Sequence, residues 1–448
     1  MAKDSPAPST ITESTTATTD DGSSTKADHL CVLIHGLWGN PTHLAHLSTS
    51  LSTKYPSSRL KVLVAKSNAG SFTYDGVEVG GERVTHEIES ELGALKSSGH
   101  NITKLSIVGY SLGGLIARYA VGLLFSKGWF QKLQPMNFTS FASPHLGVRT
   151  PTVSWGSNVW NVIGARTLSM SGQQLFTVDR FRDTGRPLLS VMCDPGSIFM
   201  RGLAAFKHRS LYCNIVNDRS APYYTTAITE TDPYKDLDYI RINYLEGYEP
   251  IMVDHSDPVQ EVTAQVQLGL WERLTTRGGA FAERIPYFLL MSLLIPVGFS
   301  VFAVNAGIQT FTSARRIQAH QSGLAGIAKG NYLFPLMIED AHEENNSDDG
   351  GVIVEPKSES AHSPSHSHAR PSRTRAKSFR RIEFPKLKLD PLQVEMVDRL
   401  GALGWSKYPV HIHKIRHSHA AIIRRMAANR YEEGLTVSRH WLDEDFEI

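Results

Sequence analysis

A serine lies between two glycines in the pentapeptide GYSLG, residues 109–113, and this pattern is typical of a nucleophilic serine. A serine hydroxyl is a weak nucleophile, so it needs a general base, an acid that orients the base, and hydrogen-bond donors for an oxyanion. The apolar run 105–108 before the motif predicts a strand, and residues 115–126 after it predict a helix. This is the strand-turn-helix context that exposes such a serine, so we predict that Ser111 is a nucleophile in acyl transfer. The alternative is a glycine-rich turn with an inert serine.

Two backbone N–H groups are the expected donors to the oxyanion. One belongs to Leu112, the residue directly after the serine. The other should come from a loop after an earlier strand, and the sequence HGLWG at residues 35–39 ends such a strand, so Leu37 is the candidate. His35 precedes Ser111 in the chain and helps to shape this loop, so we interpret it as structural and not as the base.

The acid of the predicted triad should end a strand well after the serine, because the chain order in this class of hydrolase is Ser, acid, His. Asp218 fits, since it follows the strand-like run 212–216 and stands in a turn before Pro222. An aspartate in a turn is often only a turn residue. Asp194 and Asp254 are therefore kept as weaker alternatives.

The general base is expected in the loop between the last strand and the last helix. His419 has this context, because an alternating strand-like run near 409–415 precedes it and residues 420–426 read as a helix. His417 is the second candidate, and His255, after another short apolar run, is the third. Among 19 histidines, any one of these can equally be an ordinary surface residue.

Strand-like and helix-like runs alternate along the chain, which predicts an α/β fold with a doubly wound, mostly parallel sheet. Residues 29–280 are the expected hydrolase domain, with a cap or lid at about 150–200; ordinary packing helices are the alternative for that region. Residues 1–28 and 340–380 are expected to be disordered because they are rich in polar residues and proline. Residues 390–448 are expected to return to the hydrolase domain.

Composition limits the classes of function and the cellular location. The net charge of +2 gives no field that would select nucleic acid. Three cysteines, Cys31, Cys193 and Cys213, are too few for a disulfide framework and include no close metal-ligand pair. The first residues lack the apolar stretch of a secretion signal. We therefore expect a reducing compartment, no secretion, no cofactor and no metal.

One uncharged segment, residues 285–304, has about the length of a bilayer-spanning helix. If it crossed a membrane once, Ser111 and His419 would lie on opposite sides and could never meet. Pro296 lies inside the segment and arginines flank it on both sides, which favours a hairpin or interfacial segment with both ends on the cytosolic side. A buried helix of the hydrolase domain is the alternative.

The chain resembles the DUF676 serine esterases, in their fungal lipase and phospholipase branch. The resemblance is carried by five segments of sequence: VLIHGLWG at 32–39, GYSLGG at 109–114, ASPHLG at 142–147, NDRSAPY at 217–223 and HSHAAI at 417–422. It implies an α/β-hydrolase fold and hydrolysis of acyl esters of lipids, with Ser111, Asp218 and His419 as the triad. In the third block, His145 reads as part of a structural turn.

The function expected from the sequence is therefore a lipase or phospholipase that works at a membrane or lipid-droplet surface, facing the cytosol, for example on the endoplasmic reticulum. Triacylglycerols and phospholipids are both compatible substrates. Two other classes remain open: a catalytically inactive, membrane-tethered scaffold that binds lipid, and a cytosolic esterase of acyl-proteins or small esters. The oligomeric state is left open.

Overall fold

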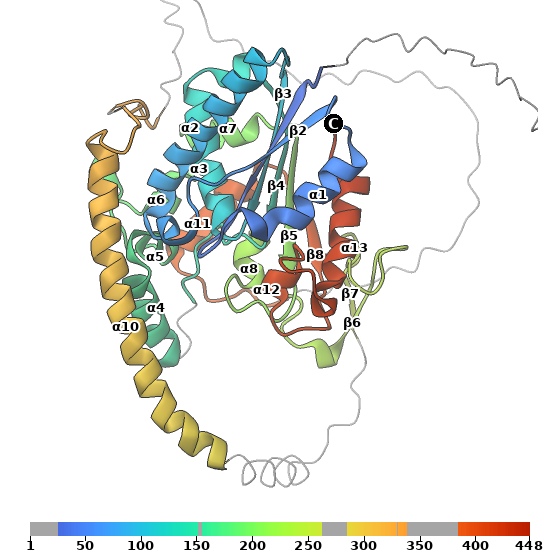
Figure 1. Ribbon diagram of the computed structural model, residues 1–448. Helices are drawn as coiled ribbons and strands as arrows, with labels where there is room; N and C mark the ends of the chain where they lie inside the picture. Colours follow the sequence, from blue (N-terminus) through green and yellow to red (C-terminus); the bar gives the residue numbers. More distant parts are fainter. Residues whose placement is uncertain (1–25, 151–154, 262–284, 329, 338–383) are drawn as a thin grey trace, which may run out of the picture.

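A parallel sheet of six strands forms the centre of the molecule, with helices on both faces (Figure 1). The structure, a computed structural model, describes residues 26–150, 155–261, 285–328, 330–337 and 384–448. The strand order is β2-β1-β3-β4-β5-β8, and every neighbouring pair is parallel. This confirms the predicted α/β class. The strands are β1 (His29–Ile34), β2 (Leu60–Val64), β3 (Lys104–Tyr110), β4 (Gln134–Phe141), β5 (His208–Asn214) and β8 (Ser406–Val410).

Strand β1 reads as a nearly continuous apolar run because both faces of the sheet are covered. In β1, Leu30, Val32 and Ile34 point into one core, whereas Cys31 and Leu33 point into the core on the opposite face. Side chains alternate between the faces of a strand, so an unbroken apolar run supplies both cores at once.

Different helices cover the two faces. The first face is covered by helices from the middle of the chain and by one from its C-terminal part: α2 (Gly76–Ser97), α3 (Leu112–Ser126), α6 (Leu188–Val191), α7 (Ile198–Ala204) and α11 (Pro391–Gly401). The second is covered by α1 (Ala45–Lys54), α12 (Ser418–Ala421) and α13 (Glu433–His440). The remaining elements lie around the sheet: α4 (Trp155–Thr167), α5 (Ser169–Leu175), α8 (Tyr223–Thr226), α10 (Ile285–Gln321), and the antiparallel pair β6 (Ile240–Ile242) and β7 (Val259–Glu261).

The strand order has a switch point at β1. The chain passes from β1 to β2 on one side of β1, and then returns to place β3 on its other side. Ile34 at the end of β1 is in register with Gly109 near the end of β3. Loops diverge at such a switch point, and parallel sheets commonly bind ligands there. The loop after β1 and the serine turn after β3 therefore lie together.

The region 150–200, expected to be a cap or lid or else ordinary packing helices, contains α4, α5 and α6 and the start of α7. Helix α7, at the end of this region, packs directly on α3, where the rings of Phe199 and Tyr119 are 4.9 Å apart. Helix α5 lies at the start of α2, where Gln174 Oε1 accepts a 2.6 Å hydrogen bond from the N–H of Val77. The predicted segment 340–380 and most of 1–28 lie outside the described residues.

Helix α10 begins at Ile285 and continues without interruption to Gln321 along the side of the domain (Figure 1). The backbone of 285–304 is thus one helix, which does not agree with a hairpin; the other predicted form, an interfacial segment, stays a prediction. The side chains of 285–299 lie outside the described part of the structure. Among the helices of the described residues, none is both long and apolar enough to cross a bilayer.

The last part of the chain completes the hydrolase sheet. Strand β8 adds to the edge at β5, so residues more than 190 positions apart become neighbours, for example Ser210 and Ser406. Helix α12 is shorter than the predicted helix 420–426, because it ends at Ala421 and turns follow.

Two buried histidines lead us to expect acid sensitivity of the fold. Burial lowers the pKa of His29 to about 4, and burial likewise lowers that of His440 to about 4. Between pH 6.5 and 4 these two histidines are protonated in the unfolded chain but stay neutral in the folded chain. The free energy of unfolding should therefore fall as the pH falls. Each such histidine contributes a slope of up to about 1.4 kcal/mol per pH unit. Urea unfolding at pH 7 and pH 5 measures this, and equal stability at both would contradict it.

Candidate active site

Ser111 occupies a strained turn between β3 and α3. Its backbone has φ 55° and ψ −128°, a conformation that non-glycine residues rarely adopt. The turn is so tight that a Cβ on Gly109 would lie 2.4 Å from Gly114 Cα. The N–H of Ser111 donates to the carbonyl of Phe141 at 2.9 Å, which continues the pairing of β3 with β4. The predicted strand-turn-helix context of Ser111 is present.

A chain of hydrogen bonds connects Ser111, His419 and Asp218. The distance from Ser111 Oγ to His419 Nε2 is 2.9 Å, and from His419 Nδ1 to Asp218 Oδ2 it is 2.8 Å. The His419 side chain is 17% exposed and the Asp218 side chain 2%. Because a carboxylate only accepts hydrogen bonds, Nδ1 carries the proton, and Nε2 is free to accept the serine proton.

Asp218 is held by a compact turn after β5. Its Oδ1 accepts hydrogen bonds from the N–H groups of Ser220 and Ala221, at 3.0 and 2.9 Å. Its Oδ2 accepts one from Asn214 Nδ2 at 2.9 Å, in addition to the bond from His419. With four donors, the carboxylate has a fixed orientation toward the imidazole.

The His419 loop is tied to both neighbouring parts of the site. Ser418 Oγ donates to the carbonyl of Val216 at 2.8 Å, which joins this loop to the Asp218 turn. Tyr110 donates its hydroxyl to the carbonyl of His419 at 2.9 Å, and the two rings are 5.2 Å apart. Burial raises the pKa of Tyr110, so it remains a neutral donor.

The loop after β1 lies against the serine. A Cβ on Gly36 would be 2.6 Å from the Cβ of Ser111, so only glycine permits this approach. The next residue is Leu37, whose N–H is the predicted second donor. The first donor, Leu112 N–H, belongs to the first residue of α3 and therefore has no partner within the helix. The two predicted oxyanion donors thus lie on the two loops that meet at Ser111.

The alternative bases lie elsewhere. His417 is exposed and directly precedes α12, whereas Ser111 Oγ bonds to His419. The exposed ring of His255 packs against Tyr408, with centroids 5.8 Å apart. Neither alternative occupies the position next to Ser111 that His419 has.

The alternative acids have other partners. Asp194 pairs with two arginines, Arg186 and Arg399. Asp254 caps its own turn by accepting from Ser256. Asp218 is the candidate acid that contacts the imidazole.

The two histidines that the sequence marks as structural are buried beside the site. His35 Nδ1 lies 3.1 Å from the carbonyl oxygen of Gly36, and burial lowers its pKa. His145 Nε2 lies 2.8 Å from Ser140 Oγ, and burial, with Arg118 nearby, holds its pKa well below the usual value. Both are therefore neutral at pH 7, and neither contacts Ser111 Oγ through a hydrogen bond in the described structure.

The cysteines and the other side chains that can bind metals are possible ligand groups. The three cysteines are free and buried. Within the described ranges, no group of three or more His, Cys, Asp or Glu side chains is arranged to hold a metal ion.

Three supporting residues were not predicted from the sequence: Tyr110, Asn214 and Ser418. Tyr110 lies inside the serine motif and Ser418 directly precedes His419, so closeness to the motifs was an available signal. Asn214 is four residues before Asp218, and its role depends on how the β5 turn folds back.

The chain is similar in sequence to serine esterases and lipases. Residues 24–231 match the family model described as "Putative serine esterase (DUF676)". "Putative lipase ROG1" of Saccharomyces cerevisiae is 27% identical over 289 residues, which cover 60% of this chain and 40% of that protein. "Putative lipase C4A8.10" of Schizosaccharomyces pombe is 28% identical over 250 residues, covering 53% of this chain and 31% of that protein. The chain thus spans less than half the length of these relatives.

Among solved structures, one similar chain is the "Alpha/beta hydrolase fold protein from Nakamurella multipartita", at 10% identity and a TM-score of 0.24, covering 46% of this chain and 80% of that one. The α/β-hydrolase fold of the present chain follows from its parallel strand order and from the strained serine turn after β3. By its match over residues 24–231 and its lipase-like relatives, the chain is similar to the DUF676 serine esterases.

Proposed function

We propose that this protein is a serine hydrolase that cleaves acyl esters of lipids through Ser111, His419 and Asp218. The observation that carries the proposal is the hydrogen-bonded chain between these three side chains, which come from the ends of three different strands. A scaffold without catalysis has no need for a strained serine turn. Such strain is commonly kept at functional sites, where the surrounding structure enforces it.

The proposed reaction has two halves. Ser111 Oγ attacks the acyl carbonyl carbon while its proton passes to His419 Nε2, and Asp218 stabilises the resulting imidazolium. The N–H groups of Leu37 and Leu112 bind the oxyanion. His419 then protonates the departing alcohol, which leaves an acyl-enzyme. Water attacks this ester, giving its proton to His419, and the fatty acid leaves as Ser111 regains its proton.

An exposed apolar stripe supports a lipid surface as the place of action. On α10, Val301, Val304, Ile308 and Phe311 are 66, 64, 55 and 59% exposed. Their spacing of three, four and three residues places them on one side of the helix. The stripe continues the uncharged segment 285–304, and the next residue in the same spacing is the exposed Arg315. Apolar side chains followed by a cation match the acyl layer and the phosphates of a membrane surface.

The same arrangement supports attachment without a crossing. Ser111 and His419 belong to one sheet although α10 lies between them in the sequence, so both ends of the helix must be on the same side of any bilayer. We therefore propose a helix that lies in the surface of a membrane or lipid droplet, on the cytosolic side. Phospholipids and acylglycerols are the proposed substrates.

A vesicle assay tests this function. Wild-type protein should release fatty acid from phospholipid vesicles, acylglycerol emulsions, or both, and hydrolyse a soluble ester such as p-nitrophenyl butyrate. The double variant I308E/F311E should lose at least about tenfold on vesicles and emulsions, because each deleted apolar contact contributes roughly 1.5–3 kcal/mol when fully buried. Its activity on the soluble ester should stay within about twofold of wild type.

The control for this stripe is N305E, which adds one glutamate, half the charge of the double variant, at an exposed polar position of the same helix. It should keep most of the activity on vesicles. Equal activity of I308E/F311E and wild type on vesicles would refute the surface role of the stripe. Absence of fatty acid release from every lipid ester by wild-type protein would refute the lipid-hydrolase proposal itself.

A further inference from the structure

The loop that carries Leu37 is held by a turn from a different part of the chain. This turn is η2 (Gly70–Tyr74). The N–H of Trp38 donates to Thr73 Oγ1 at 3.1 Å, and the Trp38 indole Nε1 donates to the hydroxyl of Tyr74 at 2.7 Å. The N–H of Gly70 donates to the carbonyl of Gly39 at 2.8 Å. Trp38 has a φ of 55°, so the loop needs such external contacts to keep its conformation.

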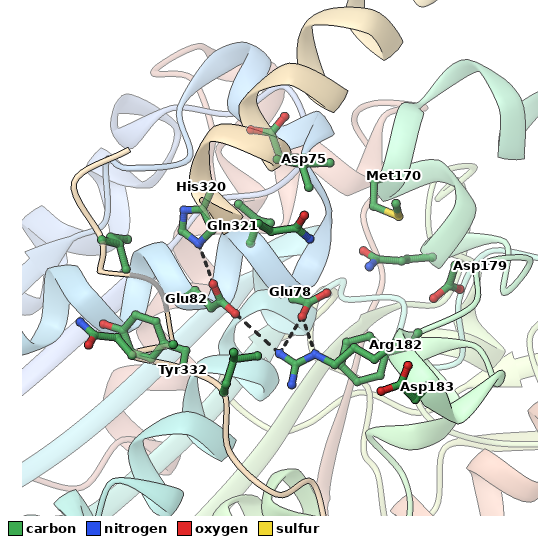
Figure 2. A pocket seen from close by; sticks show the side chains of 18 of the residues that line it. Asp75, Glu78, Glu82, Met170, Asp179, Arg182, Asp183, His320, Gln321 and Tyr332 are labelled. Atoms are coloured by element: carbon green, nitrogen blue, oxygen red, sulfur yellow. Dashed lines mark hydrogen bonds and ion pairs between the residues drawn. The ribbon is translucent and has the colours of Figure 1, made fainter. Parts of the chain in front are cut away.

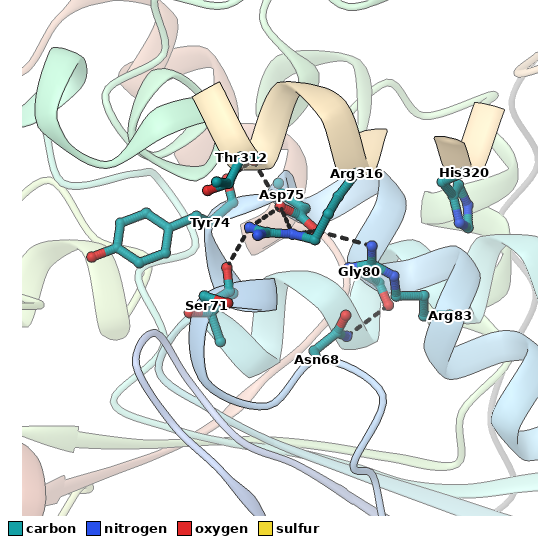
Figure 3. Close-up of polar contacts among 12 residues, drawn as sticks. Asn68, Ser71, Tyr74, Asp75, Gly80, Arg83, Thr312, Arg316 and His320 are labelled. Atoms are coloured by element: carbon teal, nitrogen blue, oxygen red, sulfur yellow. Dashed lines mark hydrogen bonds and ion pairs between the residues drawn. The ribbon is translucent and has the colours of Figure 1, made fainter. Parts of the chain in front are cut away.

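Directly after η2, Asp75 forms a buried ion cluster (Figure 3). Its side chain has no exposed surface. The carboxylate contacts Arg83 Nη2 at 2.9 Å and Arg316 Nη2 at 2.8 Å, and it accepts a 2.7 Å hydrogen bond from Ser313 Oγ. A buried carboxylate is costly unless it is paired and hydrogen-bonded, so these contacts together determine where this turn lies.

Two of the partners of Asp75 come from α10, about 240 residues later in the sequence. Arg316 also donates from Nη2 to the carbonyl of Ser71 at 2.8 Å, so it contacts the turn at two points. One helical turn further on, His320 Nε2 lies 2.6 Å from the Glu82 carboxylate of α2. That second contact borders a pocket (Figure 2) of about 530 Å³, and Ser111 is not among the residues that line it. Helix α10 is thus fastened both to the turn and, separately, to α2.

We propose that Thr73 and Asp75 are positioning residues of the oxyanion hole, and that Arg316 of α10 locks them in place. The inference rests on the proposed function, because it assigns a purpose to the Leu37 N–H. Thr73 fixes the peptide that follows Leu37, and Asp75 with Arg316 fixes Thr73. The helix proposed to lie on the lipid surface is thereby joined to the catalytic loop.

The expected consequence falls on the transition state and not on substrate binding. The negative charge on the carbonyl oxygen develops only during attack by Ser111, so a displaced N–H weakens the transition state selectively. Loss of the contacts among Thr73, Asp75 and Arg316, here called the lock, should lower kcat and leave KM nearly unchanged. A purely structural role would instead lower the melting temperature and the amount of active protein, with kcat per active site preserved.

The direct test replaces Thr73 and uses p-nitrophenyl butyrate, which needs no lipid surface. T73V keeps the shape of the side chain but removes the acceptor for Trp38 N–H, and kcat should fall about tenfold or more with KM within threefold. T73S keeps the hydroxyl and should restore kcat to within about twofold of wild type. Hydrogen exchange of the Trp38 amide should accelerate in T73V and not in T73S. Wild-type kcat and wild-type Trp38 exchange in folded T73V would overturn the proposal.

The lock itself is tested with two residues of α10. R316A removes the contacts to Asp75 and Ser71, and it should lower kcat and accelerate exchange of the Trp38 amide. H320A removes the contact to Glu82 one turn away and should leave both nearly unchanged. If H320A lowers kcat as much as R316A does, general loosening of α10 explains the effect and the lock through Asp75 is wrong.

The two levels of inference fail in different ways. If wild-type protein hydrolyses no ester, the serine-hydrolase proposal fails, and a catalytic purpose for the lock fails with it. If wild-type protein is active and T73V, T73S and R316A all match it, only the lock is refuted. Trp38 exchange reports on the loop in both cases, because it does not depend on activity.

Discussion

The S111A variant is expected to lose about 10⁴- to 10⁶-fold in kcat on every ester that the wild-type protein hydrolyses, which is the range known for removal of a triad nucleophile. The reason is geometric. Ser111 Oγ is the proposed nucleophilic atom in the strained turn, and His419 Nε2 lies 2.9 Å away to take its proton. No covalent acyl-enzyme can form without this oxygen.

The measurement pairs ester hydrolysis with labelling by a fluorophosphonate probe, which reacts with activated serines. Wild-type protein should be labelled, and S111A should not. The matched control is S90A, which removes an exposed serine hydroxyl from α2 and should behave as wild type. Labelling or hydrolysis that persists in S111A would assign the chemistry to another residue.

The loss in S111A should occur without unfolding. The turn is held by backbone contacts, such as Ser111 N–H to the carbonyl of Phe141, and alanine keeps them. Alanine also keeps the Cβ atom that packs against Gly36, so the loop after β1 should keep its position. An unchanged urea midpoint for S111A therefore separates lost chemistry from lost structure.

The sequence predicted the sheet well because its strands are buried on both faces. Residues 29–34 and 104–110 are mostly apolar and almost all buried, and such segments carry a strong signal. The strand β8 was harder to place, since its residues are mostly half-exposed at the edge of the sheet. The short helix α12 was predicted too long for a different reason: residues 420–423 are buried apolar residues, and burial alone does not distinguish a helix from a packed turn.

The site could be anticipated where chemistry follows local sequence. A serine turn has steric requirements that glycines reveal, and a histidine loop after the last strand has a fixed place in the chain order. The Asp75 cluster had no such signal. Asp75, Arg83 and Arg316 are ordinary charged residues in the sequence, and only the packing of α10 on the η2 turn brings Arg316 to a carboxylate more than 200 residues away.

The lid and the apolar segment show the limits of hydrophobicity as a signal. Residues 188–204 are apolar because α6 and α7 pack on the domain, and a lid would carry a similar composition. Residues 285–304 are uncharged, but they belong to a helix whose later half bonds to Asp75 and Glu82. The composition of residues 188–204 and 285–304 shows that both segments are apolar. What each segment packs against is decided by the tertiary fold.

The second large effect is expected for H419A, which should lose about 10⁴- to 10⁶-fold in kcat, whereas H255A should stay within about twofold of wild type. His419 lies between Ser111 Oγ and Asp218, so its loss removes the acceptor of the serine proton and the donor to the leaving alcohol. His255 packs on Tyr408 and offers a matched histidine deletion. Steady-state hydrolysis of p-nitrophenyl butyrate decides between the two.

The outcome for His419 also bears on whether the chain can cross a membrane at α10. If H419A is inactive and H255A is active, residues before and after α10 act in one site, and the chain cannot cross a bilayer once between them. The reverse result would refute the triad, because His255 and not His419 would then act as the base. Since His255 precedes α10, a single crossing would in that case be compatible with catalysis. An inactive H419A would therefore exclude a single crossing and agree with the proposed surface position of the exposed stripe of Val301, Val304, Ile308 and Phe311.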